Sequence, residues 1–185
     1  MGWYVRSVRD AKWWDYGPAG FGALLIDDDD PQIGVNLFVL EPGQPMSMYH
    51  WEADQEGFLV LSGEALLIVG AEIVSGEAGD DQRQTPGRLQ RPGREDEERP
   101  LRQWDYFHCP PKVPHTIVGA GNGPAAILAI GARVDSVGDN WGAYPYSEVA
   151  MRHDASAEED TTDQEVAYAR FPKRVDGEFR EGWLP

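Results

Sequence analysis

The sequence has a single cysteine, no long apolar run and few basic residues. Cys109 is the only cysteine among 185 residues, which excludes an internal disulfide framework and favours a reducing compartment. No apolar run approaches the length that crosses a membrane, and the N-terminus lacks the apolar core of a signal peptide. We therefore expect a cytoplasmic protein with no membrane partner.

Basic residues are half as numerous as acidic ones. Lys and Arg number 16 against 32 Asp and Glu, so the formal net charge is -16 at pH 7. A surface this acidic repels a phosphate backbone, and nucleic acid is not an expected partner. The four aspartates at 27–30 are interpreted as a solvated turn, because a calcium loop spaces its ligands and needs a glycine turn.

Turn residues and aromatics are abundant instead. The chain has 21 glycines, 14 prolines and 11% aromatic residues, which favours a single, mostly β domain. Short apolar runs between Gly/Pro turns predict the strands, and a capping box from Thr162 to Glu165 predicts the start of the second of two short helices. The expected strands are 21–26, 33–40, 58–61, 65–69, 101–109, 116–118 and 125–134, and the expected helices are 147–152 and 163–170.

The chain divides into three expected parts. Residues 1–20 form an aromatic N-terminal arm, residues 21–134 form the barrel, and residues 135–185 form a C-terminal extension with the short helices. Within the barrel, residues 70–100 are rich in Gly, Pro and charged residues and have little to bury, which predicts a loop insertion.

Three side chains near the first buried strand have the spacing of a ligand cluster. His50 and Glu52 are two residues apart and point to the same face of a strand, and Glu56 opens the next strand and can reach the same point. His115, after the proline-rich turn at 110–114, is the candidate that completes the set. Two imidazoles with one or two carboxylates suit one divalent transition metal ion: Fe, Mn, Zn or Ni.

Two motifs in this order resemble those of the cupin superfamily. The first is His50-Trp51-Glu52, then Glu56 and Gly63; the second is Trp104-Asp105 followed by PPKVPH at 110–115. Glu52 stands where the family has a second His, and Lys112 where it has a Gly. The resemblance implies an all-β, double-stranded β-helix (jelly-roll) barrel with short C-terminal helices.

The first motif can be aligned in two registers. Counting from Gly43 places the family's two His positions on Tyr49 and Trp51, which have the opposite strand parity to His50 and Glu52. One register gives a metal centre of His50, Glu52, Glu56 and His115, and the other gives an aromatic pocket without metal. Either His108 or Cys109 must face the interior, and Cys109 is interpreted as a buried small hydrophobe.

The resemblance implies a metal-dependent cupin that acts on a small metabolite, as an oxygenase, isomerase or decarboxylase. The alternative is a non-catalytic cupin that binds a small molecule such as a sugar, or a metal ion. Phe58 and Phe107 are the expected substrate-binding residues. Aromatics crowd both terminal segments and are enriched at interfaces, so a homodimer is expected.

Overall fold

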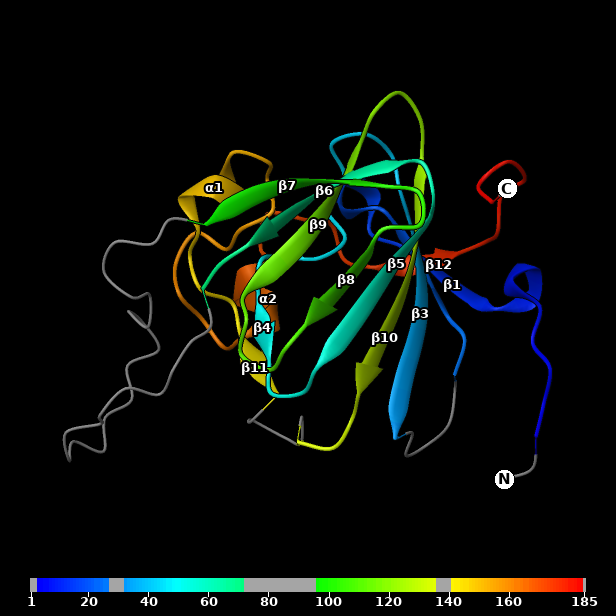
Figure 1. Ribbon diagram of the computed structural model, residues 1–185, viewed down its shortest axis with the longest axis horizontal. Helices are drawn as coiled ribbons and strands as arrows, with labels where there is room; N and C mark the ends of the chain where they lie inside the picture. Colours follow the sequence, from blue (N-terminus) through cyan, green and yellow to red (C-terminus); the bar gives the residue numbers. More distant parts are fainter. Residues whose placement is uncertain (1–2, 27–31, 72–95, 136–140, 185) are drawn as a thin grey trace.

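The computed structural model describes residues 3–26, 32–71, 96–135 and 141–184, and strands dominate it (Figure 1). The expected all-β fold class is confirmed. The strands are β1 Lys12–Asp15, β2 Phe21–Leu24, β3 Ile33–Leu40, β4 Trp51–Glu52, β5 Glu56–Ser62, β6 Glu64–Val69, β7 Glu97–Arg102, β8 Tyr106–Cys109, β9 His115–Ala120, β10 Ala125–Ala132, β11 Gly142–Ala143 and β12 Val175–Gly177. The helices are α1 Glu148–Met151 and α2 Gln164–Ala167, with 3₁₀ turns at Val8–Asp10 and Gly17–Ala19.

The strand order is that of a jelly roll. One antiparallel sheet runs β12-β1-β2-β3-β10-β5-β8, and the other runs β7-β6-β9. Residues 44–50 extend the second sheet beside β9, because Met46 N donates to Ile117 O and His50 N donates to His115 O. The facing halves are therefore β3-β10-β5-β8 and 44–50-β9-β6-β7, the eight-strand arrangement of a double Greek key. The expected barrel is confirmed.

The core lies between these two sheets. Its fully buried members come from both, and apolar runs such as Phe58 to Leu61 are continuous because each strand is covered on both faces. The β5–β6 hairpin turns at Gly63, whose φ of 77° favours glycine; a Cβ there would lie 2.5 Å from the Pro124 carbonyl oxygen. The core residues include Leu40, Phe58, Leu67, Ile117 and Ile127.

Both terminal segments pack on their own barrel. β1 pairs with β2 and β12, which places residues 12–15 of the expected arm within the larger sheet. Trp183 packs against Trp13 and Phe21, with ring centroids 5.0 and 4.6 Å apart. Most of the terminal aromatics that suggested a subunit interface are thus covered within one chain, although Trp3 is 92% exposed. The homodimer stays a prediction.

One expected strand is two. The run 101–109 was expected to be continuous, but β7 ends at Arg102 and β8 begins at Tyr106. Trp104 has a φ of 73°, which interrupts the extended backbone, and Asp105 Oδ2 accepts a hydrogen bond from Arg102 N at 2.8 Å to close the turn. The loop expected at 70–100 is also shorter, because residues 97–100 pair with β6; residues 72–95 lie outside the described residues.

The helices are shorter than expected, and one cap differs. The predicted capping box at Thr162 is wrong: α2 is capped by Asp163, whose side chain accepts a hydrogen bond from Glu165 N at 2.8 Å. α1 is capped by Ser147 through Ala150 N. In the described part of the chain, no helix is both long and apolar enough to cross a membrane.

Candidate metal centre

The segment before β5 places His50 toward the interior. Its neighbour Tyr49 is fully buried on the other side, where it packs with Ile68, Val118 and residues of α1. His50 and Glu52 instead line a cavity together with Glu56. Of the two registers, the structure therefore has the one with His50 and Glu52 inward, and the aromatic register is not observed.

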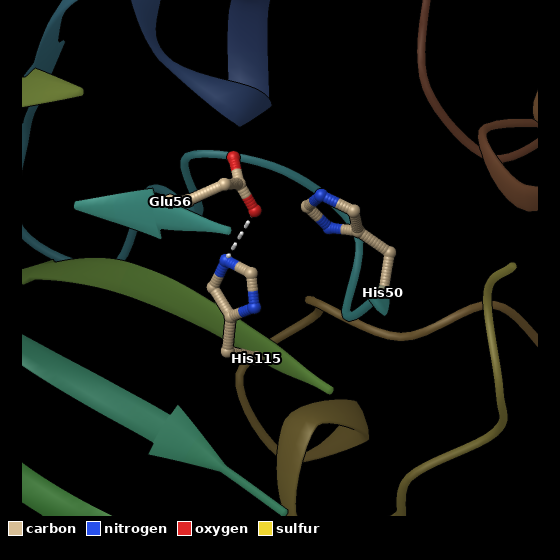
Figure 2. Close-up of side chains that lie close together, drawn as sticks. All are labelled: His50, Glu56 and His115. Carbon is tan, nitrogen blue, oxygen red and sulfur yellow. Dashed lines mark ion pairs between the residues drawn. The ribbon is translucent and has the colours of Figure 1, made fainter. Parts of the chain in front are cut away.

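Three donor side chains meet across the barrel from opposite sheets (Figure 2). His50 and His115 exchange backbone hydrogen bonds as a directly opposed antiparallel pair, so their rings share a face with centroids 5.1 Å apart. Glu56 opens β5 on the facing sheet, and its Oε2 lies 3.4 Å from His115 Nε2. One ligand atom from each of the three lies within 4.8 Å of the others.

Each imidazole is fixed by a backbone carbonyl two residues earlier. Nδ1 of His50 lies 2.8 Å from the Met48 carbonyl oxygen, and Nδ1 of His115 lies 3.0 Å from that of Val113. A carbonyl oxygen only accepts, so both Nδ1 atoms carry the hydrogen. Both Nε2 atoms then present a lone pair to the cavity, which is the outer-shell support that metal-binding histidines have in proteins.

His115 Nε2 is the observation that tests whether a cation fits. The residue is fully buried, and among the described residues no hydrogen-bond partner satisfies this nitrogen. A buried polar atom without a partner is rare, and here it lies 3.4 Å from a carboxyl oxygen of Glu56. A metal ion satisfies both, so the three residues fit the cation that the sequence led us to expect.

The pKa shifts favour a neutral His115 and a Glu56 carboxyl that gives up its proton less readily than usual in the absence of a cation. Burial, and then the nearby His50, lower the pKa of His115 to about 3. Burial, and then the charge of Glu52, raise the pKa of Glu56 to about 7. For His50, burial lowers the pKa, but the contact with Glu52 and the charge of Glu56 outweigh it and the net shift is upward. A bound cation would replace these protons.

Glu52 lies beside the three-residue group and is neutralised by an arginine. Its Oε1 lies 3.6 Å from His50 Nε2, and its Oε2 lies 3.2 Å from Arg133 Nη1. Burial raises the pKa of Glu52, but His50 and Arg133 outweigh this and lower it. Arg133 lies across Gly34, where an added Cβ would come 2.8 Å from its guanidinium. Glu52 as a fourth ligand stays a prediction.

The cavity next to these donors is small and largely aromatic. Its volume is about 200 Å³. Phe58 lines it, whereas Phe107 lies behind Phe58, stacked at 5.8 Å, and lines a separate hollow beside β6 and β7. The structure thus brings one of the two expected substrate-binding residues to the metal cavity. The other aromatic lining residues are Trp14, Tyr16, Phe38, Trp141, Tyr144 and Tyr168.

Comparisons with known proteins give structural matches only. No protein-family model and no curated protein sequence matches the chain. A cupin-superfamily sugar phosphate isomerase from Silicibacter pomeroyi is 25% identical over 63% of this chain and 61% of its own, with a TM-score of 0.45. The chain therefore spans about three fifths of that protein. A Cupin 2 conserved barrel domain protein from Salinispora arenicola is 14% identical over 72% of this chain and 92% of its own, with a TM-score of 0.49.

A cupin 2 domain-containing protein from Halorhodospira halophila also matches, at 17% identity over 73% of this chain and 75% of its own, with a TM-score of 0.46. The strand order of the barrel is that of a jelly roll, the architecture that includes the cupins among other proteins.

Several residues of the cavity were not anticipated from the sequence. Asn36 is the one polar residue in the apolar run of β3, and its Oδ1 is buried without a hydrogen-bond partner among the described residues. A polar residue within an apolar strand could have been noticed in the sequence, and so could Arg133, which directly follows the apolar β10. Nothing in the sequence marked Trp14, Tyr168 or Arg174 as cavity residues, because only the path of the terminal segments brings them to the cavity.

The remaining histidines and the cysteine have structural positions. Cys109 faces inward and His108 is exposed, because neighbouring residues on a strand such as β8 point to opposite faces. The Cys109 Sγ lies 3.2 Å from His115 Nδ1, and burial, followed by the charges of Glu56 and Glu52, raises the pKa of the thiol. A thiol held protonated is a poor nucleophile, in keeping with its expected role as a small buried side chain. His153 pairs with Glu98 at 2.7 Å, away from the cavity.

Proposed function

We propose that this cupin is a metal-dependent enzyme: His50, Glu56 and His115 bind one divalent transition metal ion, and the cavity beside them holds a small organic substrate. The observation that carries the proposal is the pair of imidazoles with Nδ1–H fixed on backbone carbonyls, so that two Nε2 lone pairs and a buried carboxylate face one another. Without a cation, that arrangement leaves His115 Nε2 unsatisfied. We expect the enzyme to act as a cytoplasmic homodimer.

Two imidazoles and one carboxylate are the ligand set of non-haem Fe(II) oxygenases, so oxidation with dioxygen is the first reaction to test. When bound, the ion supplies Lewis-acid chemistry and, as Fe(II), the activation of dioxygen. The chain contributes positioning: the Met48 and Val113 carbonyls fix both rings.

Glu52 supports isomerisation or decarboxylation as a second candidate reaction. Arg133 and His50 lower its pKa, so the carboxylate is ionised and lines the same cavity. An ionised carboxylate beside a bound substrate can accept a proton from it, which isomerisation requires. The arginine that holds Glu52 ionised also holds it in place.

The test is metal content followed by turnover. Protein purified without added metal should contain about one transition metal ion per chain, as a preformed site with buried donors predicts. Glu56→Gln and His115→Ala should lose the metal, and the two together guard against one variant failing to fold. His108→Ala, an exposed histidine of β8, is the matched control and should keep it.

Turnover is then measured as dioxygen uptake by the Fe(II)-loaded protein against a panel of small metabolites, with product analysis for isomers and decarboxylated species. Uptake or conversion that requires Glu56 supports the enzyme. No metal in the purified protein, together with no thermal shift on adding Fe, Mn, Zn or Ni, refutes the metal centre. Metal binding without turnover of any member of the panel favours the non-catalytic cupin.

A further inference from the structure

Arg174 is a cation of the cavity that has no acidic partner among the described residues. It lies just before β12 in the C-terminal segment and lines the same cavity as His50 and Glu56. Its guanidinium carbon lies 5.5 Å from the centroid of the Trp14 ring and 6.0 Å from that of Tyr16. Stacking on these two rings fixes the group without using its hydrogen-bond donors.

Other arginines near the barrel have acidic partners. Arg133 pairs with Glu52 at 3.2 Å, and Arg170 lies 3.5 Å from Asp154. Arg180 stacks on Phe21 at 4.4 Å and lies 3.9 Å from Asp15. Arg174 is exposed at the border of the cavity, and its guanidinium lies near two aromatic rings, so its N–H donors are available to a carboxylate or phosphate.

The charges that line the cavity also favour an anionic ligand. Two carboxylates, Glu52 and Glu56, and two arginines, Arg133 and Arg174, line it. With both carboxylates ionised these four charges cancel, so a divalent cation leaves the loaded cavity with an excess of positive charge. In a chain whose net charge is -16, that excess selects an anion at this one place.

The walls and the size restrict the rest of the ligand. Five of the lining residues are aromatic and come from the terminal segments, and flat apolar groups pack well on such rings. They are Trp14, Tyr16, Trp141, Tyr144 and Tyr168. The volume of about 200 Å³ equals that of six or seven water molecules at about 30 Å³ each. This suits a compact molecule of about the size of benzoate.

We propose that the substrate is a small organic carboxylate with a flat apolar body, bound through its carboxylate by Arg174. The carboxylate accepts hydrogen bonds from the guanidinium at the Trp14 and Tyr16 side of the cavity, and the body extends along the aromatic wall toward His50 and Glu56. This assignment deepens the proposed function and rests on it for the excess positive charge.

The test is isothermal titration calorimetry with benzoate and phenylacetate, each compared with its neutral amide, on protein whose metal content has been measured. The acids should bind more tightly than benzamide and phenylacetamide. Arg174→Gln should weaken binding of the acids by at least about tenfold, the scale of a lost charge-assisted hydrogen bond, and leave the amides unchanged. Arg174→Lys should retain part of the preference, since it keeps the charge but loses the planar fork.

Arg180→Gln is the matched control. It removes a second arginine stacked on aromatic rings in the same C-terminal segment, but one that does not line the cavity. Its binding of the acids should equal that of the parent. Equal losses in both variants, equal binding of acids and amides, or no binding of either acid would overturn the assignment. Binding of inorganic phosphate but not of the acids would overturn the choice of carboxylate.

Metal content separates this assignment from the proposed function. A chain that contains metal but binds acids and amides alike refutes only the role of Arg174. A chain that contains no metal, and that binds none when it is added, refutes the metal-dependent enzyme whatever the acids do.

Discussion

Glu56→Gln should stabilise the metal-free protein at high pH while it abolishes metal binding. The carboxyl of Glu56 is buried next to Glu52, and these two influences raise its pKa from 4.5 to about 7. Below pH 4.5 the group is protonated in both the folded and the unfolded chain, and it contributes no pH-dependent term. As the pH rises toward and through 7, the unfolded chain releases the proton freely, whereas the folded chain releases it only against burial and repulsion.

The size of the effect follows from that difference in pKa. At about 1.4 kcal/mol for each pH unit, ionised Glu56 lowers the free energy of unfolding by up to about 3 kcal/mol above pH 7. Glutamine has nearly the same shape and no charge, so the Glu56→Gln variant does not lose this free energy of unfolding as the pH rises. The variant should therefore resemble the parent at pH 4.5 and exceed it at pH 8, provided that chelator has removed all metal.

Urea unfolding followed by tryptophan fluorescence at the two pH values measures this directly. Glu64→Gln, which changes an exposed carboxylate at the start of β6, is the control and should not widen the gap between pH 4.5 and pH 8. Added metal should reverse the order at pH 8, because only the parent gains binding energy, about 4.1 kcal/mol at a metal concentration 1,000 times Kd. If the variant is no more stable than the parent at pH 8, or takes up metal equally well, the reasoning about Glu56 is refuted.

Three further predictions follow from single features. His115→Ala should reduce metal content to background while the far-ultraviolet circular dichroism of the barrel is retained, and His108→Ala should leave both unchanged, as elemental analysis will decide. Phe58→Ala should lower the free energy of unfolding by about 3–5 kcal/mol in urea titrations, because the ring is 2% exposed in the core; a loss below 1 kcal/mol would contradict its packing role. Light scattering at micromolar concentration should give about 41 kDa, twice the 20.6 kDa chain, because β8 is the last strand of its sheet among the described residues and lies beside exposed Trp104 and Tyr106; a mass of one chain would contradict the dimer.

The barrel and its donors were predictable because they depend on local patterns. Strand parity places His50 and Glu52 on one face, and the turn after Glu52 returns the chain so that Glu56 opens the facing strand. The proline-rich turn at 110–114 ends with His115 at the start of β9. Parity alone left two registers open, and the direct pairing of His50 with His115 is what selects one of them.

What the sequence did not reveal depends on contacts between distant segments. Asp163 rather than Thr162 caps α2, since both are good caps and only the final turn geometry favours one. The break at Trp104 interrupts a run that has strand composition throughout, and its positive φ has no glycine to announce it. Arg174 reaches the cavity only because β12 pairs with β1, more than 150 residues earlier in the chain.

The candidate metal donors and the cavity residues Trp14 and Arg174 come from different parts of the chain, which allows the two sets to have separate functions. His50, Glu56 and His115 lie on or beside barrel strands that form the main core, so their positions are fixed by the same packing that stabilises the fold. Trp14 and Arg174 come from β1 and the residues before β12, at the edge of the larger sheet. Substitutions at that edge can alter which ligand enters with little effect on the donors, because the two sets share no backbone hydrogen bonds along the strand order. With Arg174 assigned as proposed, the terminal segments rather than the barrel would set the ligand preference of this protein.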